Sequence, residues 1–438
     1  MMMKKGGMKM DQPIKDAIQR VLLELEENLC AEIPLEEWAA GLGYSPWYFS
    51  RQFQSIVGMP LGQYRTRRRL MHALYAISRG ESITNAALRF GFDTHAGFFK
   101  AFQQEYGCSP SQYIKLHRVN RPRPLILKEE RYPMISNLQW KQALAHWGLD
   151  APLSPIVYPG SGRIHESCRM AGEHYLLKAY TDEALCQRQV RLFLAMKDHQ
   201  LPAPCPLPLS DGAYAAALGG LHFTLSRAME GKPLLAAHLL EGPIRENGRC
   251  IGRALFQLHQ ALDHMTPCPI DQQQCLADTL RYWALPSIRH LQVLDEGWLR
   301  QYEEKMLSVF SRLPTGPIHR DPNPSNLILL PQGGIGFADF DLAECNLRLF
   351  DPCYAATAVL SECFEKRDAW PLFLEGIMAG YGEEQPLSAQ EKQAVPLIAL
   401  AMEMICLAAF KDQDKYQDVF NVNLQMLNWM KELPMMAL

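Results

Sequence analysis

An internal duplication in residues 14–118 constrains the fold of this chain more than any other feature. A repeated spacing of this kind predicts two copies of one supersecondary unit, because each copy must solve the same packing problem. The spaced residues Ser45, Phe49, Phe53 and Tyr64 recur in the same order and at the same intervals as Thr94, Phe98, Phe102 and Tyr113.

Each copy reads as a helix, a tight turn and a second helix. In the first copy Gly43 can adopt the left-handed conformation that ends a helix, and Ser45 is a suitable N-cap. Pro46 then occupies the first helical position, where a backbone N–H is not needed. The second copy repeats the turn with Gly91 and Thr94. The stretch TRRRLMHALYAI between the copies predicts a helix that holds the two units at a fixed spacing.

The outward positions of both second helices carry polar or basic groups, which favours a nucleic-acid partner over helical hairpins with no special role. The distribution of charge along the chain also favours a nucleic-acid partner for this segment. Residues 1–130 hold 18 Lys and Arg against 13 Asp and Glu, whereas the whole chain has a net charge of −3. A basic segment on an acidic remainder is typical of a part that meets a polyanion. The outward residues are Ser50, Arg51 and Gln54 in the first copy and His95, Lys100 and Gln103 in the second.

This segment resembles the DNA-binding domain of AraC/XylS-type transcription regulators over residues 14–118. The matching stretches are SPWYFSRQF, RLMHA, the Gly91–Phe92 pair and GCSPSQY. The resemblance implies an all-α double helix-turn-helix domain whose second helices enter the major groove of double-stranded DNA. Arg51 would contact guanine in bidentate fashion, whereas the second unit, poorer in hydrogen-bonding groups, would mainly hold phosphates. The DNA-facing residues so implied are Trp47, Ser50, Arg51, His95, Ala96, Phe99 and Lys100.

The chain changes character after this segment. With 438 residues it is long enough for two or three separate cores. Three prolines and mixed charges predict an extended linker at residues 119–133. We expect residues 1–13 to be a disordered start. Residues 134–438 should form a second domain, with a small lobe at about 145–230 and a large lobe at about 231–430.

The segment GPIHRDPNPSNLILLPQGGIGFADFD carries the chemistry of the second domain. An apolar run ends at His319-Arg320-Asp321, and Asn326 precedes a strand, a Gly-Gly turn and a second strand that ends at Asp339. Hairpin geometry would bring Asp321, Asn326 and Asp339 to one end of the pair. Two carboxylates and an amide suit Mg²⁺, which takes oxygen ligands and bridges phosphate groups. The alternative is a polar loop with satisfied turn residues, but this spacing favours phosphoryl transfer.

This part of the chain resembles the aminoglycoside phosphotransferase and choline kinase-like family, over residues 145–420. The resemblance implies an α+β, two-lobed fold of the protein-kinase type that uses ATP or GTP with Mg²⁺. Arg320 stands where the family commonly has glycine, a variant that looks like protein kinases. The roles so implied are Asp321 as catalytic base, Asn326 and Asp339 as magnesium ligands, and His319 and Asp351 as structural residues, with Asp351 bracing the catalytic loop.

The smaller lobe offers a nucleotide-binding lysine. Lys178, in the strand YLLKAY, occupies the place of the family lysine that pairs with ATP phosphates, and Gly160 and Gly162 form a turn that would cover them. The alternatives are a solvent-facing lysine and an ordinary hairpin turn. Where the family has a glutamate to pair with this lysine, the best-aligned residue is the neutral Gln189, with Glu183 the other candidate. A neutral partner leaves nucleotide binding in place but puts the full catalytic rate in doubt.

These features predict a cytoplasmic, DNA-binding transcription regulator that carries an ATP- and magnesium-dependent phosphotransferase for a small hydroxyl-bearing molecule. Two alternatives stay open: a regulator whose kinase-like domain only senses a ligand or nucleotide, and two fused functions without coupling. No apolar run approaches the roughly 18 residues of a membrane span, and the longest, Pro396–Phe410, is interrupted by Glu403 and reads as a buried helix. The twelve cysteines lack metal-binding spacing and are read as reduced thiols. A second copy of the chain, as in a homodimer, stays open as a further partner.

Overall fold

The computed structural model describes residues 12–31, 33–57, 59–106, 108–116, 119, 122, 135–157, 164–270, 272–411 and 417–436. Gly160, Gly162, most of the predicted linker and residues 1–11 of the predicted disordered start lie outside the described residues. By mutual contacts the chain divides into two compact units. The first unit comprises Met1–Val157, Gly162–Glu183 and Leu207–Leu225, and the second unit comprises Tyr158–Ser161, Ala184–Pro206 and Ser226–Leu438.

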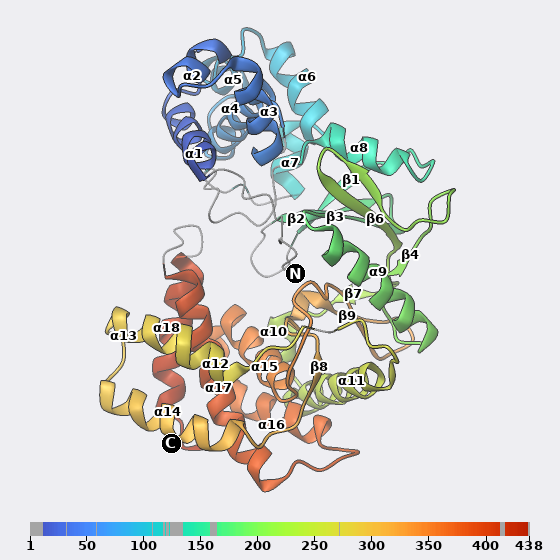
Figure 1. The fold of residues 1–438 in the computed structure, drawn as a ribbon, viewed down its shortest axis with the longest axis vertical. Coiled ribbons are helices and arrows are strands. Elements are labelled where there is room, and N and C mark those ends of the chain that lie inside the picture. Colours follow the sequence, from blue (N-terminus) through green and yellow to red (C-terminus); the bar gives the residue numbers. More distant parts are fainter. Residues whose placement is uncertain are drawn as a thin grey trace, which may run out of the picture. The chain divides into compact units, whose positions relative to one another are not determined.

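The N-terminal part of the first unit is a helical head (Figure 1). In this head α2 and α3 form one helix-turn-helix unit, α5 and α6 form the second, and α4 connects them. This is the double arrangement that the duplication predicts. The described helices of the head are α1 (Gln12–Glu27), α2 (Leu35–Gly41), α3 (Pro46–Val57), α4 (Leu61–Ser78), α5 (Ile83–Arg89), α6 (His95–Tyr106) and α7 (Pro110–Leu116).

The two tight turns have the geometry that the sequence predicts. Gly43 and Gly91 have φ values of +76° and +78°, in the left-handed region where a side chain would be strained. The Ser45 hydroxyl accepts a hydrogen bond from a backbone amide of α3 at 3.3 Å. The Thr94 hydroxyl accepts one from a backbone amide of α6 at 3.0 Å. These capping bonds begin the second helix of each unit.

Each helix-turn-helix unit has its own aromatic core. Phe49 and Phe53 of α3 are fully buried with Tyr64 of α4, in a cluster that includes the apolar face of α1. Phe98 and Phe102 of α6 occupy the equivalent places in a second cluster. Burial of one such side chain contributes roughly 2 kcal/mol of hydrophobic free energy. The repeated aromatic residues therefore stabilise both copies in the same way.

A sheet whose described strand pairs are antiparallel forms most of the remainder of the first unit. Helix α8 (Asn137–Ala145) packs Trp140 against this sheet, in a core with Leu177 of β3 and Phe223 of β6. The strand order is β1-β2-β3-β6-β4, with β5 paired to β6, and the end of β6 that continues into the second unit pairs with β4. The strands are β1 (Leu153–Val157), β2 (Ile164–Ala171), β3 (Tyr175–Tyr180), β4 (Cys205–Pro206), β5 (Ala216–Leu218) and β6 (Leu221–Arg227).

The second unit is mainly helical, with two small antiparallel sheets in the orders β10-β9-β7 and β11-β8 (Figure 1). Its helices are α9 (Glu183–Asp198), α10 (Ala236–Leu239), α11 (Ile244–His264), α12 (Leu276–Thr279), α13 (Leu285–Leu291), α14 (Glu296–Phe310), α15 (Phe350–Glu362), α16 (Trp370–Tyr381), α17 (Ala389–Phe410) and α18 (Gln417–Lys431). A π-helical turn spans Leu280–Ala284, and 3-10 turns span Pro324–Asn326, Phe364–Ala369 and Pro434–Met436. The strands are β7 (Lys232–Pro233), β8 (Thr315–Ile318), β9 (Leu327–Leu329), β10 (Ile335–Phe337) and β11 (Glu344–Leu347).

Glycines let α11 and α16 cross at very close range. A Cβ atom at Gly252 would overlap the carbonyl of Ile377, and one at Gly380 would overlap the carbonyl of Arg249. Because α11 carries His259, this close crossing fixes the position of a residue that belongs to the candidate site described below.

Helix α17 contains the longest apolar run of the chain. By length and composition alone it could cross a bilayer, yet 67% of its most apolar window is buried inside the protein. It contacts α15 and α18 in the core of the second unit. This agrees with the prediction that Pro396–Phe410 is a buried helix.

A charge cluster joins α1 to α4 in the head. The Glu26 carboxylate accepts hydrogen bonds from Arg68 at 2.5 and 2.8 Å, and it lies 2.5 Å from Nε2 of His72. Burial would raise the pKa of Glu26, but the hydrogen bonds from His72 and Arg68 outweigh it and lower the pKa to about 2. A carboxylate with a depressed pKa stabilises the fold above its unfolded pKa, and this stability is lost as pH falls toward the folded value.

We therefore expect Glu26→Gln to lower the free energy of unfolding of the head at neutral pH by roughly 1–2 kcal/mol, allowing for solvent screening. The deficit should shrink as pH falls through the interval from the ordinary glutamate pKa to about 2. Hydrogen exchange of α1 and α4 amides measures this stability. Glu36→Gln, at an exposed position of α2, is the matched control. An equal deficit at every pH would contradict the assignment.

Candidate functional site

The predicted hairpin is present and gathers the polar residues of the central motif. Strands β9 and β10 pair in antiparallel register, with Leu327 opposite Phe337. Beyond the paired ends, the Ala338 amide donates a hydrogen bond to the Asn326 carbonyl at 3.0 Å. His319 Nε2 also contacts the Ala338 carbonyl at 2.9 Å. The segment that precedes β9 and the segment that follows β10 are thus held together at one end of the hairpin.

Asp351 holds the loop that contains the histidine, arginine and aspartate of the motif. Its side chain is fully buried at the start of α15. Its carboxylate accepts hydrogen bonds from the backbone amides of His319 at 2.7 Å and Arg320 at 2.8 Å. Nε2 of His259 lies 2.9 Å from the same carboxylate, and Nδ1 of His259 lies 2.8 Å from the Tyr381 hydroxyl. These contacts make His259 a structural residue that holds Asp351 in place.

The electrostatics of Asp351 follow from these contacts. Burial alone would raise the pKa of its carboxyl group. The hydrogen bond and charge of His259, together with His319, outweigh burial and hold the pKa below its ordinary value. Asp351 is therefore an ionised acceptor for backbone amides that would otherwise be buried without partners.

Arg320 adopts a backbone conformation that glycine adopts more easily. Its φ is +75°, in the left-handed region. Its guanidinium donates to Glu344 at 2.8 Å and lies 4.1 Å from the ring centroid of Phe350. Strain of this kind persists where surrounding contacts over-determine the conformation, and it gathers at functional sites. The ion pair, the aromatic contact and the Asp351 bond explain how arginine is tolerated where the family commonly has glycine.

Asp321 lies at the tip of this loop with two amide partners. Asn323 Nδ2 donates to its carboxylate at 2.9 Å. Asn326 Nδ2 donates to the Asp321 carbonyl at 2.9 Å and lies 3.4 Å from its carboxylate. Burial raises the pKa of Asp321, the charge of Asp339 raises it further, and the Asn323 and Tyr354 hydrogen bonds lower it in part. A carboxylate with a raised pKa, next to a second carboxylate, can accept a proton.

The residues predicted to hold magnesium fit a hard cation. Asn326 is buried, and since its amide nitrogen is engaged by Asp321, its amide oxygen is the remaining acceptor. Asp339 follows β10 with a φ of +61°. Among the described residues no group of three His, Cys, Asp or Glu side chains could hold a metal ion. Asn326 and Asp339 would supply oxygen ligands of the kind that a divalent ion such as Mg²⁺ prefers.

Helix α9 is anchored to the segment that follows Asp339. The buried Gln189 donates through Nε2 to the Phe340 carbonyl at 2.6 Å, and Arg188 donates to the Asp341 carbonyl at 3.2 Å. The rings of Phe193 and Phe340 meet edge to face at 5.9 Å. Within the described chain Gln189 Oε1 has no hydrogen-bond partner. Gln189 therefore serves first to hold α9 on this segment.

Lys178 lies on β3 opposite Cys168 of β2. Only 5% of its surface is exposed, and its Nζ lies 5.3 Å from the ring centroid of Tyr180. The alternative of a solvent-facing lysine is therefore wrong. The partnership with Gln189 stays a prediction, and Gly160 and Gly162 lie outside the described residues.

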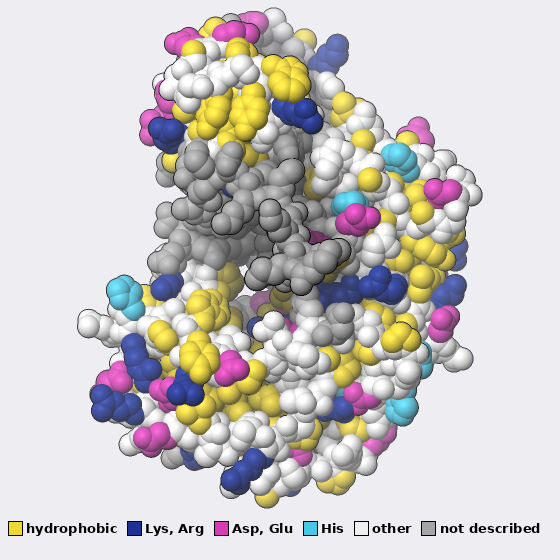
Figure 2. Space-filling model, in the orientation of Figure 1, with side chains coloured by type: hydrophobic (Ala, Val, Ile, Leu, Met, Phe, Trp, Pro, Cys, Tyr) yellow, Lys and Arg dark blue, Asp and Glu magenta, His cyan; other side chains and the backbone are white. Residues whose placement is uncertain are grey.

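The predicted DNA-facing residues lie on the accessible surface of the head. Trp47 is 68% exposed, and the Arg51 guanidinium lies 5.4 Å from its ring centroid. Phe99 is half-buried, with its ring stacked on that of His95 at 5.9 Å. Hydrophobic and basic side chains lie next to each other on the visible face of the head (Figure 2). Exposed with Trp47 are Arg51, His95, Ala96 and Lys100, and Ser50 is half-buried.

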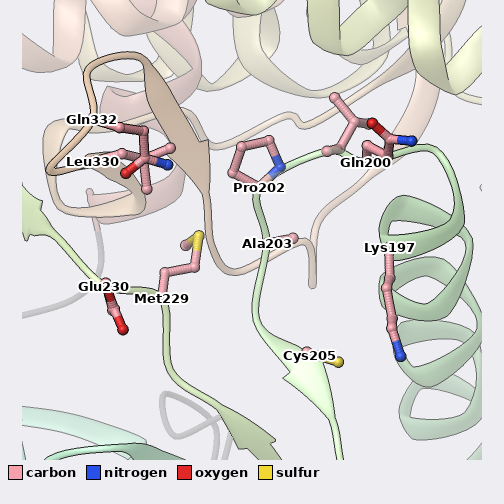
Figure 3. A pocket seen from close by; sticks show the side chains of 10 residues that line it. Lys197, Gln200, Pro202, Ala203, Cys205, Met229, Glu230, Leu330 and Gln332 are labelled. Atoms are coloured by element: carbon pink, nitrogen blue, oxygen red, sulfur yellow. The ribbon is translucent and has the colours of Figure 1, made fainter.

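A separate cavity of about 290 Å³ lies within the second unit (Figure 3). Its wall carries both apolar and polar side chains, with the charged Lys197 and Glu230 at different places on it (Figure 3). None of the predicted catalytic or nucleotide-binding residues is among its lining residues. The lining residues are Lys197, Gln200, Leu201, Pro202, Ala203, Cys205, Met229, Glu230, Leu330 and Gln332.

Sequence reasoning missed Tyr354, Asn323 and Glu344. Tyr354 lies three residues after Asp351 on α15. Helical spacing could therefore have placed both side chains on the face of α15 that meets the loop. Asn323 is two residues from Asp321, within reach of a local side-chain hydrogen bond. Glu344 could not be found from the sequence, because its contact with Arg320 depends on the pairing of β11 with β8.

Comparison with known proteins agrees with both parts of this description. The pattern of a helix-turn-helix domain matches residues 38–116, and that of a phosphotransferase enzyme family matches residues 160–391. The HTH-type transcriptional activator AarP of Providencia stuartii is 37% identical over 97 residues, which are 22% of this chain and 72% of that protein. Both resemblances expected from the sequence are confirmed.

Relatives of the second part are more distant. A homoserine kinase of Rhizobium etli is 29% identical over 225 residues, which are 47% of this chain and 64% of that enzyme. The chain therefore spans less than two thirds of that relative's length. Among solved structures, the GDP and kanamycin complex of APH(2")-IIia has a TM-score of 0.52 at 14% identity, over 67% of this chain and 99% of its own. That likeness confirms the predicted kinase-like fold.

Asp351→Asn tests the bracing of the loop. The amide nitrogen of asparagine cannot accept from the His319 and Arg320 amides, so one buried donor loses its partner. We expect the second unit to lose roughly 3 kcal/mol of unfolding free energy or more. Denaturant unfolding measures the loss, and Asp368→Asn, at an exposed position, should stay within about 0.5 kcal/mol of wild type. Equal stability of the two variants would show that the loop does not depend on Asp351.

Proposed function

Because the chain belongs to the phosphotransferase enzyme family and begins with an AraC-type helix-turn-helix domain, we propose that it is a transcription regulator that also phosphorylates a small molecule. The observation that carries the proposal is the loop braced by Asp351, which holds Asp321 against Asn326, whose carbonyl is bonded to the residue that precedes Asp339. Two neighbouring carboxylates, one with a raised pKa, suit a base beside a metal ligand. We propose that both activities take place in the cytoplasm.

The proposed reaction is transfer of the terminal phosphoryl group of ATP or GTP to a hydroxyl group. A bound magnesium nucleotide supplies that phosphoryl group, and the metal neutralises its developing charge. Asp321, which is held in position by Asn323, accepts the proton of the acceptor hydroxyl. Asn326 and Asp339 would hold the magnesium ion. Lys178 binds nucleotide phosphates, and its low exposure supports a specific partner over bulk solvent.

The proposed acceptor is a small molecule that carries a hydroxyl group. One relative is a homoserine kinase, and one structure of similar fold was solved with kanamycin. Both names direct a screen toward hydroxyl-bearing amino compounds.

A second candidate function is a regulator whose kinase-like part binds ligand without efficient turnover. The observation that favours it is Gln189, a neutral residue whose amide is engaged by Phe340. A neutral side chain cannot compensate the charge of a lysine. Turnover with a true acceptor would exclude this alternative, and saturable nucleotide binding without turnover would support it.

The proposed partner of the head is double-stranded DNA. Trp47 and Arg51 are exposed on α3, and His95 and Lys100 are exposed on α6. Arg51 can donate two hydrogen bonds to guanine in the major groove. Lys100 can neutralise a phosphate. Whether the chain binds as a homodimer is open to a measurement of its mass in solution.

Asp321→Asn should lower phosphate transfer by roughly 10²–10⁴-fold and leave the affinity for magnesium nucleotide nearly unchanged, because the base acts on the acceptor. Asp339→Ala should remove magnesium-dependent nucleotide binding. Steady-state kinetics and nucleotide titration measure these effects, with Asp368→Asn as control. Full turnover by Asp321→Asn would refute the catalytic assignment.

Arg51→Ala should weaken binding to the preferred DNA sequence by roughly 1–3 kcal/mol and relax its specificity. Lys100→Ala should weaken binding to all DNA sequences alike. It should also reduce the slope of log affinity against log salt concentration by about one. Competition binding at several salt concentrations measures both. Arg79→Ala, an exposed residue after α4, removes the same charge and is the control. If the three variants changed the affinity for all DNA sequences equally, Arg51 would not read a base.

A further inference from the structure

Helix α8 connects the helical head to the sheet within the first unit. Asn137, at the start of α8, donates through Nδ2 to the Gln104 carbonyl of α6 at 3.0 Å. The Ile135 carbonyl, just before α8, accepts a hydrogen bond from Arg67 of α4 at 3.1 Å. On its other side α8 packs Trp140 into the core of the sheet. The second helix-turn-helix unit and the sheet therefore share one helix.

A cluster of charges lies at the same junction. Arg67 Nε of α4 lies 3.1 Å from the Glu105 carboxylate of α6, and both side chains are largely buried. Arg169 of β2 has its guanidinium 5.1 Å from the ring centroid of Trp140. Burial and the charge of Arg67 lower the pKa of Arg169 to about 10, while Glu105 raises it. Burial raises the pKa of Glu105, and Arg67 and Arg169 both oppose that rise. The Glu105 carboxylate of the head thus pairs with Arg67 of the head, and its charge also acts on Arg169 of the sheet.

The sheet side of this junction leads directly to Lys178. Arg169 pairs with Leu177, and its neighbour Cys168 pairs with Lys178. Leu177 and Ala179 lie in the core that α8 covers. Since side chains alternate along a strand, Lys178 lies on the opposite face of β3. The strand that carries Lys178 is thus held by α8 on one face and paired along its edge to the strand that carries Arg169.

We propose that Arg67, Glu105, Asn137 and Arg169 form a latch that links DNA binding by α6 to the strand carrying Lys178. His95 and Lys100 lie in the first half of α6, where DNA would bind, and Gln104 and Glu105 lie near its end, where the latch is. Restraint of the start of α6 by DNA therefore reaches β2 and β3 through the latch. By linkage, a ligand of Lys178 changes DNA affinity by the same factor that DNA changes ligand affinity. This last consequence rests on the proposed function.

Hydrogen exchange of the full chain, with and without DNA, tests the latch without any nucleotide. The probe is a duplex selected in vitro for binding to the full chain. DNA should slow amide exchange in α3 and α6, and also in α8, β2 and β3, by roughly fivefold or more. Protection limited to α3 and α6 would overturn the latch and leave DNA binding intact. Protection nowhere would overturn the DNA-binding proposal and the latch with it.

Two substitutions locate the link. Glu105→Gln removes the shared charge, and Asn137→Ala removes the bond from α8 to α6. Both should abolish the DNA response of β2 and β3 and keep that of α3. Glu36→Gln and Asn85→Ala, at exposed positions of the head, make the same chemical changes and should keep the full response. A full sheet response in both latch variants would overturn the proposal. The wild-type comparison decides the matter even if a variant fails to fold.

Discussion

The hydrogen bonds that Asp351 accepts are the interaction on which the candidate site depends. A single buried carboxylate holds the amides of His319 and Arg320, and His259 holds that carboxylate in turn. The loop then projects Asp321 toward the end of the β9–β10 hairpin. Because Asp351 and both histidines are fully buried, removal of one partner leaves the others without compensation. This network links α11, α15 and the loop into one rigid support.

Two strained residues mark the same place. Arg320 and Asp339 both have positive φ values, a conformation that residues with side chains rarely adopt. Such strain costs on the order of 1–3 kcal/mol at each position and survives only where other contacts compensate. For Arg320 the compensation is visible in Glu344, Phe350 and Asp351. The strain therefore accompanies a precise placement of the loop, as expected of a site that positions reacting groups.

Local patterns in the sequence were sufficient for much of the architecture. Gly43 and Ser45 predicted a turn and a cap because glycine and serine act there through their own backbone and hydroxyl. The hairpin of β9 and β10 could likewise be predicted from the local sequence. The contact of Gln189 with Phe340, and that of Arg67 with Glu105, could not be predicted, because each joins elements whose proximity is set by tertiary packing. Lys178 was placed on its strand, but only the structure could show that it is buried.

The central claim is that this braced loop supports phosphoryl transfer in a chain that also reads DNA. The most direct test is a screen of the purified full chain with γ-labelled ATP and Mg²⁺ against amino alcohols, hydroxyl-bearing amino acids and aminoglycosides. The account predicts that label moves to one class of acceptor and that omission of Mg²⁺ abolishes the transfer. Saturable nucleotide binding without transfer to any acceptor class would contradict it and leave the kinase-like part as a ligand sensor.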